Sequence, residues 1–226
     1  MLEEHKLPLD SFIGGWYISP NICDSLIDVF KKNPSHHKEG VIGGPYNVNK
    51  NNKDSVDLGL HPDYTDPAFM NYKNSLKECV SLYEKKYTEL SEFNPYGMNE
   101  GANIQYYKPG AGYFAEHCER TSKNENRCLV WMTYLTDTPD GGTNFKYQNI
   151  TVPCKKGLTL IWPTDFTHTH SGQISKTHEK YIITGWFGYE KSLWEDDPRT
   201  VRKDEKTGLK YHNFGSLTRK WLMTPI

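Results

Sequence analysis

The sequence lacks the features that mark membrane-spanning, disulfide-stabilised and nucleic-acid-binding proteins. Among its 226 residues, no apolar run approaches the roughly 18 residues that a transmembrane helix requires. The five cysteines are an odd number and include no Cys-x-x-Cys pair, so we expect neither a disulfide framework nor a cysteine-rich zinc site. Lys and Arg number 27 against 28 Asp and Glu, so no basic excess signals nucleic-acid binding.

A secretory signal is also missing from the first ten residues. The segment MLEEHKLPLD has neither a basic region nor an apolar region. Together with the cysteine pattern, this predicts a soluble, cytoplasmic protein of a reducing compartment with no membrane partner.

What the sequence does contain is typical of a packed globular protein. Hydrophobic residues make up 36 %, aromatic residues 13 % and charged residues 24 %, which excludes wholesale disorder and a coiled coil. We expect a single domain over residues 1–226. Within it we predict an N-terminal support of helices and loops over 1–100, a core over 101–190 and a C-terminal extension over 191–226.

Two helices are predicted in the N-terminal part. Residues 20–32 have apolar positions at helical spacing, with Ser19 as N-cap and Pro20 in the first turn. The polar, Gly- and Asn-rich segment 34–66 is typical of a surface loop. Residues 67–92 form the stronger helical pattern. Its apolar positions recur at steps of three and four: Phe69, Tyr72, Leu76, Cys79, Val80, Tyr83, Tyr87 and Leu90.

Beyond residue 100 the pattern changes to short β-prone segments separated by turn signals. This spacing is typical of a sandwich, jelly roll or barrel. The predicted strands cover residues 102–107, 113–119, 128–135, 143–147, 150–152, 157–162 and 180–189.

The triplet His117-Cys118-Glu119 lies in one of these predicted strands. Because side chains alternate along a strand, His117 and Glu119 are expected to face the same way and Cys118 the other. Two histidines and one carboxylate on one face form the site that non-haem Fe(II) oxygenases use, with open positions for substrate and dioxygen. By itself the triplet is common, so a third ligand must come from elsewhere.

The distal segment offers that ligand and a cation. His168 and His170 both precede a Ser-Gly turn, and both would point to the same side of a strand. His170 is favoured because Lys180 follows it by ten residues at the start of an apolar strand. A hairpin of this kind can hold a metal and a small dianion together. Thr184 shares a strand face with Lys180, as do Ile182 and Trp186.

These residues carry a resemblance that spans about residues 104–189. In order, the landmarks are YKPG at 107–110, GYFAEHCE at 112–119, RC…YL at 127–135, GGTNF at 141–145, and His170 followed by Lys180 and YIITGW at 181–186. They resemble the Fe(II)/2-oxoglutarate-dependent dioxygenases, in particular the prolyl 4-hydroxylase-like branch. The family usually has Asp where this chain has Glu119.

The resemblance implies a fold and a set of site residues. The implied fold is mainly β with flanking helices: a double-stranded β-helix, or distorted jelly roll, with the N-terminal helices packed on one sheet. The implied iron ligands and catalytic residues are His117, Glu119 and His170. The implied 2-oxoglutarate-binding residues are Lys180, which pairs with the distal carboxylate, and Tyr107, Tyr134 and Thr184.

It also implies a reaction. Members of the family use Fe(II), 2-oxoglutarate and dioxygen, with ascorbate as an accessory reductant, to hydroxylate an unactivated C–H bond and release succinate and carbon dioxide. The first substrate implied is a prolyl residue in a peptide or protein, such as a proline-rich segment. The alternatives are the same chemistry on a free amino acid or a nucleobase, or a non-catalytic metal-binding jelly roll.

Overall fold

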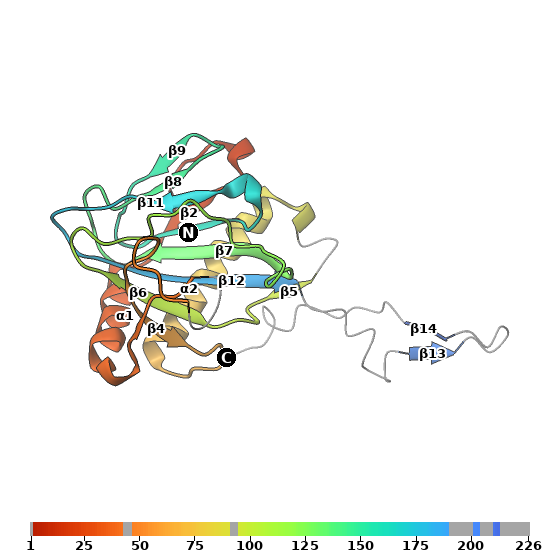
Figure 1. The fold of residues 1–226 in the computed structure, drawn as a ribbon. Coiled ribbons are helices and arrows are strands. Elements are labelled where there is room, and N and C mark those ends of the chain that lie inside the picture. The colour runs from red at the N-terminus through yellow and green to blue at the C-terminus, as the bar shows by residue number, and fades with distance from the viewer. Residues whose placement is uncertain (1, 43–46, 91–94, 190–200, 204–209, 213–226) are drawn as a thin grey trace.

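The computed structural model describes residues 2–42, 47–90, 95–189, 201–203 and 210–212. Within them the chain forms a nine-stranded sheet, a three-stranded sheet and a separate two-stranded pair, all antiparallel. The small sheet lies over one face of the large sheet, and the two long helices lie on the other side (Figure 1). The fold is therefore mainly β, as the sequence predicted.

The strands come from distant parts of the sequence. The large sheet runs in the order β1 (Glu3–Glu4), β2 (Gly14–Tyr17), β10 (Leu158–Pro163), β7 (Arg127–Tyr134), β12 (Lys180–Tyr189), β6 (Ala102–Tyr107), β4 (Val56–Leu60) and β3 (Lys38–Glu39), with β5 (Tyr96–Gly97) paired to β12. The small sheet consists of β11 (His170–Gly172), β8 (Thr143–Phe145) and β9 (Ile150–Val152). The pair consists of β13 (Val201–Lys203) and β14 (Lys210–His212).

The period-two alternation of β7 divides the core into two layers. Trp131 points to the helix side, where it packs in one apolar cluster with Ile183 and the helices. Val130 and Met132 point the other way, into a second cluster with Phe145 of the small sheet. These two layers, with helices on one sheet and a second sheet on its other face, are those of a double-stranded β-helix.

The helices follow the predicted start signals more closely than their ends. Helix α1 (Pro20–Lys32) has the predicted bounds, although the Ser19 side chain makes no capping hydrogen bond. Helix α2 (Pro67–Lys86) begins after Asp66, whose carboxylate accepts from the Ala68 amide. The helix predicted over residues 67–92 is interrupted, because the backbone leaves the helical region at Tyr87 while its side chain still packs against the core. Residues 89 and 90 are helical again. Residues 91–94 lie outside the described residues.

Two further predictions need correction. The expected surface loop over residues 34–66 contains the short helix η2 (Pro34–His36) and the strands β3 and β4, and β4 pairs with β6 along five residues. The apolar alternation of Val56, Leu58 and Leu60 is the local signal for β4. Strands β1 and β2 likewise come from the part expected to hold helices and loops.

The predicted strand over residues 113–119 is not a continuous strand. The amide of Phe114 donates to Asn52, His117 forms an isolated bridge with His170, and the Glu119 amide donates to Thr164. Because the partner changes every few residues, no ladder forms. The segment is nevertheless pinned at three points, which fixes the course of its backbone.

The C-terminal extension predicted over residues 191–226 lies outside the described residues apart from β13 and β14.

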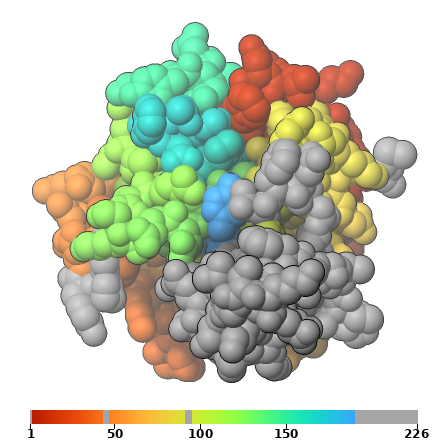
Figure 2. All heavy atoms as spheres, turned by 90° about the vertical axis from the view of Figure 1, so that its right-hand side faces the viewer, coloured from red at the N-terminus to blue at the C-terminus, as the bar shows by residue number. Residues whose placement is uncertain are grey.

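The described part also contains two short helices, η1 (Leu9–Ser11) and η3 (Phe166–His168). No helix of the described part is both long and apolar enough to span a bilayer. Figure 2 shows the face at which β12 ends, with its last residues (blue) at the surface. The Tyr189 amide donates to the Asn126 carbonyl.

A glycine in β12 makes room for the largest core side chain. A Cβ atom on Gly185 would lie 2.2 Å from Cζ2 of Trp131, which is completely buried. Gly185→Ala is expected to lower the free energy of unfolding by about 1–3 kcal/mol, the usual cost of overpacking. Gly59→Ala in β4 is the control, since its nearest new contact would be an ordinary 3.6 Å. Urea unfolding of both variants measures the difference, and equal midpoints would contradict the prediction.

Candidate active site

A cavity of about 660 Å³ lies between the two sheets and is lined by residues of both. Its large-sheet wall is the pocket face of β6, β7 and β12. Lys180, Ile182, Thr184 and Trp186, expected to share one strand face, all line it. The bend around His117 and the start of β11 provide the opposite wall.

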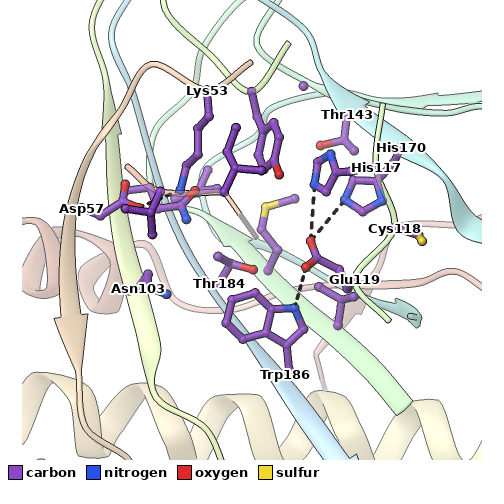
Figure 3. Close-up of a pocket in the computed structure, with 18 of the residues that line it drawn as sticks. Lys53, Asp57, Asn103, His117, Cys118, Glu119, Thr143, His170, Thr184 and Trp186 are labelled. Carbon is purple, nitrogen blue, oxygen red and sulfur yellow. Dashed lines mark hydrogen bonds and ion pairs between the residues drawn. The ribbon is translucent and has the colours of Figure 1, made fainter. Parts of the chain in front are cut away.

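Three side chains meet at one end of this cavity (Figure 3). The ligand atoms that His117, Glu119 and His170 offer all lie within 4.8 Å of one another. Oε1 of Glu119 is 3.4 Å from Nε2 of His117 and 3.8 Å from Nε2 of His170. The two histidines are brought together by their backbones, which exchange a pair of 2.9 Å hydrogen bonds. Two residues close in sequence thereby meet a third from another strand.

The ring orientation of both histidines suits metal binding. Nδ1 of His117 lies 2.9 Å from the Ala115 carbonyl, and Nδ1 of His170 lies 2.9 Å from the His168 carbonyl. A carbonyl accepts only, so Nδ1 carries the proton and Nε2 keeps its lone pair on the side of Glu119. The same arrangement is found where histidines ligate metal ions in proteins.

Electrostatics give these groups the protonation states that a metal needs. Burial lowers the pKa of His170 to about 4, with the neighbouring His117 acting in the same direction. Burial alone would raise the pKa of Glu119. The contacts of its carboxylate with His117, His170 and Arg127 outweigh burial and hold that pKa at about 2. His170 is therefore neutral and Glu119 ionised near neutral pH.

Lys180 lies in the same cavity as a buried cation. Its ammonium donates to the carbonyls of Gly141 at 3.0 Å and Gln173 at 3.3 Å, and lies 5.0 Å from the ring centre of Tyr107. Within the described residues no carboxylate forms an ion pair with it, and burial lowers its pKa. Because buried charges are normally paired, an unpaired ammonium facing a cavity suits an anionic ligand.

The other candidate cosubstrate residues also line the cavity. The Tyr107 hydroxyl donates to Oε1 of Gln105 at 2.6 Å. The Tyr134 hydroxyl lies 2.6 Å from the Thr143 hydroxyl. The Thr184 hydroxyl donates to the Trp131 carbonyl at 3.1 Å, so in this conformation it can offer a ligand only its acceptor side.

His168, the alternative ligand, is not brought into this group. Its Nε2 lies 2.9 Å from the Ser11 carbonyl, and the residue ends the short helix η3 rather than continuing a strand. Its side chain is buried but is not part of the cavity lining. The geometry thus separates two histidines that simple alternation along a strand would place side by side.

Comparison with known proteins identifies a family whose profile matches the part of the chain that provides most of the residues lining this cavity. Residues 102–188 match the profile of the 2OG-Fe(II) oxygenase superfamily, which spans both histidines, Glu119 and Lys180. Residues 102–188 are a 2OG-Fe(II) oxygenase domain. By this match the enzyme is a 2-oxoglutarate-dependent dioxygenase. No curated protein matches the sequence.

Several solved structures share the fold of this dioxygenase. A prolyl-4-hydroxylase from Pseudomonas putida has a TM-score of 0.62 at 14 % identity, covering 80 % of this chain and 96 % of its own. The viral collagen prolyl hydroxylase from Paramecium bursaria Chlorella virus-1, in its 2OG complex, has a TM-score of 0.58 at 18 % identity, covering 78 % and 95 %. A Trichoplax adhaerens prolyl hydroxylase, in complex with a hypoxia inducible factor peptide fragment, has a TM-score of 0.57 at 16 % identity, covering 74 % and 76 %. At these identities the likeness concerns the fold.

The donor set of the dioxygenase fits a ferrous ion. Two imidazole nitrogens and one carboxylate oxygen are the ligands of the two-histidine, one-carboxylate iron sites, which leave positions open. Among the described residues no other group of three His, Cys, Asp or Glu side chains has this geometry. The ammonium of Lys180, which forms no ion pair within the described residues, is a suitable partner for a carboxylate of a ligand in the same cavity.

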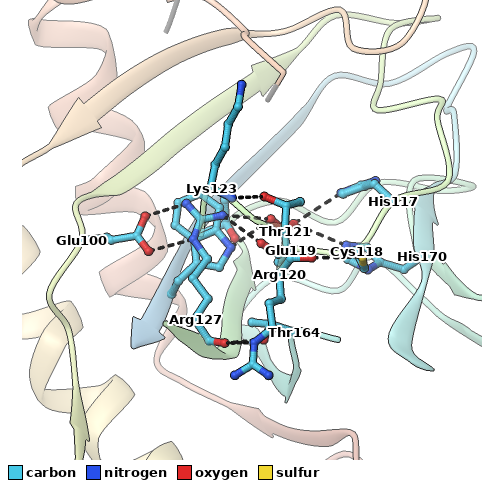
Figure 4. A network of polar contacts seen from close by, with 12 residues as sticks. Glu100, His117, Cys118, Glu119, Arg120, Thr121, Lys123, Arg127, Thr164 and His170 are labelled. Carbon is cyan, nitrogen blue, oxygen red and sulfur yellow. Dashed lines mark hydrogen bonds and ion pairs between the residues drawn. The ribbon is translucent and has the colours of Figure 1, made fainter. Parts of the chain in front are cut away.

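The groups that hold the carboxylate of Glu119 on the side away from the histidines were not predicted from the sequence (Figure 4). Oε2 of Glu119 accepts from the indole N–H of Trp186 at 3.0 Å and lies 3.5 Å from Arg127. The Arg127 guanidinium stacks on the Trp186 ring at 3.6 Å and makes two short hydrogen bonds to Glu100. Trp186 shares a strand face with Lys180, which was the signal that it faces the site rather than the core.

Removing the indole hydrogen bond tests this support. Trp186→Phe keeps an aromatic ring but leaves Oε2 of Glu119 without its N–H donor. The affinity for Fe(II) or Co(II) is expected to fall by about 10-fold or more, as for other groups that orient ligands. Titration with Co(II), followed by its visible absorption, measures the change. Trp162→Phe is a control, since its indole nitrogen has no hydrogen-bond partner, and an unchanged affinity in Trp186→Phe would contradict the assigned role.

Proposed function

We propose that this dioxygenase hydroxylates prolyl residues in a peptide or protein, using Fe(II) held by His117, Glu119 and His170. The observation that carries the proposal is the pairing of a converged ligand set with a buried, uncompensated ammonium in one cavity. A metal site alone has no need of such a cation. Fold likeness to three prolyl hydroxylases supports the prolyl substrate.

Different residues contact the two ends of the cosubstrate. Lys180 binds the distal carboxylate, and Tyr107 and Tyr134 line the space between it and the metal. A bound ferrous ion supplies the dioxygen-activating redox chemistry, which converts 2-oxoglutarate and dioxygen to succinate and carbon dioxide and places one oxygen atom on the substrate. The protein contributes position, charge and the exclusion of water.

The wall formed by Trp186 and Arg127 supports a prolyl side chain near the metal. The indole ring is held flat by the stacked guanidinium and by its hydrogen bond to Glu119. A rigid aromatic surface offers an apolar contact to a saturated ring. The Trichoplax relative was solved with a peptide fragment, which makes a peptide the natural first class of substrate to test.

The test is a coupled assay with defined substrates. The enzyme is incubated with Fe(II), 2-oxoglutarate, dioxygen and an array of proline-containing decapeptides, with and without ascorbate. Succinate and the peptide mass are measured together. We expect peptide-dependent succinate release and a gain of one oxygen atom on proline. Succinate release with free amino acids or nucleosides, but with no decapeptide, would contradict the prolyl assignment.

A further inference from the structure

The cavity continues from the metal ligands to a polar region that the reaction chemistry leaves unused. Lys53, Asp57, Asn103 and Gln105 line this region, which we call the amide wing. In Figure 3 the labelled Lys53, Asp57 and Asn103 lie across the pocket from the metal ligands. Asn103 and Gln105 share the pocket face of β6, whereas Ile104 between them packs in the core on the other side.

The charges of the amide wing are already neutralised. The Lys53 ammonium lies 2.7 Å from Asp57, and the Ser55 hydroxyl donates to the same carboxylate at 2.7 Å. The Lys53 side chain is 5 % exposed and that of Asp57 is 12 % exposed. Breaking a buried pair leaves an uncompensated charge, so these groups are not available to a ligand. The wing therefore lacks the separated charges that would bind the ammonium and carboxylate of a free amino acid.

The hydrogen-bonding capacity that remains is neutral. In the described part of the chain, the Asn103 side chain has no hydrogen-bond partner, and neither has Nε2 of Gln105. Oε1 of Gln105 accepts from Tyr107, which fixes the amide so that Nε2 is the free atom. Asn103 is half-buried and both residues line the cavity, so a ligand that enters it can supply the missing hydrogen-bond partners. Each of these side chains thus offers at least one donor to the cavity.

The spacing of the two amides matches a peptide main chain. Alternate residues of a strand are about 6–7 Å apart, and an extended chain points every second carbonyl to the same side at nearly the same interval. A prolyl residue lacks the amide N–H and keeps only its carbonyl acceptor. The donors of Asn103 and Gln105 therefore complement two carbonyls that lie two residues apart on one side of an extended, proline-containing chain.

We propose that the amide wing binds the main chain of an extended peptide substrate, with the side-chain amides of Asn103 and Gln105 donating to two of its carbonyls. This inference rests on the proposed function and narrows its substrate class to extended peptides. The wing sets the position of the chain while the target residue lies near Trp186.

Two variants separate the donors from the rest of the site. Asn103→Leu removes a side-chain amide that forms no hydrogen bond within the described residues. Gln105→Glu keeps the acceptor for the Tyr107 hydroxyl and removes the free donor. Each variant is expected to weaken peptide binding about 3- to 10-fold, the effect of losing one neutral hydrogen bond. Asn74→Leu, at an exposed position of α2, is the matched control with unchanged binding.

The probe is a fluorescein-labelled (Pro-Ala)5 decapeptide, titrated under nitrogen into the enzyme loaded with Fe(II) and 2-oxoglutarate, with fluorescence anisotropy as the readout. The dissociation constant of 2-oxoglutarate, measured in parallel, should stay within about 2-fold of wild type. Wild-type peptide affinity in both variants would overturn the amide wing, as would the absence of saturable (Pro-Ala)5 binding to wild type. The proposed function is judged separately, by hydroxylation of the decapeptide array by the wild-type enzyme.

Discussion

His170→Ala is expected to lose high-affinity metal binding and, with it, all 2-oxoglutarate-dependent turnover. The imidazole of His170 is one of only three ligand groups that converge in the described cavity. Its removal should weaken Fe(II) or Co(II) binding by about 1,000-fold or more, because changes outside the ligand set alone cost ~10–100-fold. His117→Ala should behave in the same way. Metal content after gel filtration and Co(II) titration measure the loss.

The matched control is the neighbouring histidine. His168 lies two residues away, but its Nε2 faces the Ser11 carbonyl rather than the cavity. His168→Gln is therefore expected to retain metal affinity and turnover, with a lower melting temperature from the altered buried hydrogen bond. If His168→Gln lost the metal while His170→Ala kept it, the assignment of the distal ligand would be wrong.

The contrast between these two histidines shows what alternation along a strand can predict. The sequence pattern treats His168 and His170 as equivalent, since they are two residues apart. Residues 166–168 form a short helix, so the period of two does not apply to them. Only the ten-residue spacing to Lys180 favoured His170, and that spacing works because β11 and β12 are successive strands on opposite walls of one cavity.

His117 and Glu119 were predicted to face the same way because side chains alternate along a strand. The structure brings them together by a different route. Their segment forms no continuous strand, yet both side chains reach one point. The backbone of His117 is fixed by its exchange with His170, and that of Glu119 by its bond to Thr164. The local pattern predicted that these two side chains face the same way, and long-range hydrogen bonds supply the geometry that brings them together.

The amide wing could not be predicted from local sequence. Lys53 and Asp57 fall in a polar stretch that is typical of a surface loop. They reach the cavity because β4 pairs with β6, placing Asp57 opposite Gln105. Pairing between strands so far apart in sequence depends on the whole sheet rather than on neighbouring residues. The same holds for Trp186, whose partner Glu119 lies 67 residues earlier.

Lys180→Met is expected to weaken 2-oxoglutarate binding more than any other change outside the metal ligands. Truncating one partner of a buried charge pair costs about 2–5 kcal/mol, or roughly 30- to 5,000-fold in affinity. Metal affinity should stay near that of wild type, because Lys180 makes its hydrogen bonds to Gly141 and Gln173 and none to the metal ligands. Calorimetric titration of the Mn(II)-loaded protein with 2-oxoglutarate separates the two effects.

Without cosubstrate, the same substitution, Lys180→Met, should stabilise the protein. Without cosubstrate, Lys180 is a buried ammonium whose pKa is lowered by burial, and methionine fills similar space without a charge. Lys180→Met should therefore raise the melting temperature of the apo protein while removing the stabilisation that 2-oxoglutarate gives to wild type. Lys146→Met, at an exposed position outside the cavity, should change neither quantity. A variant that bound 2-oxoglutarate within about 3-fold of wild type would show that the distal carboxylate is held elsewhere.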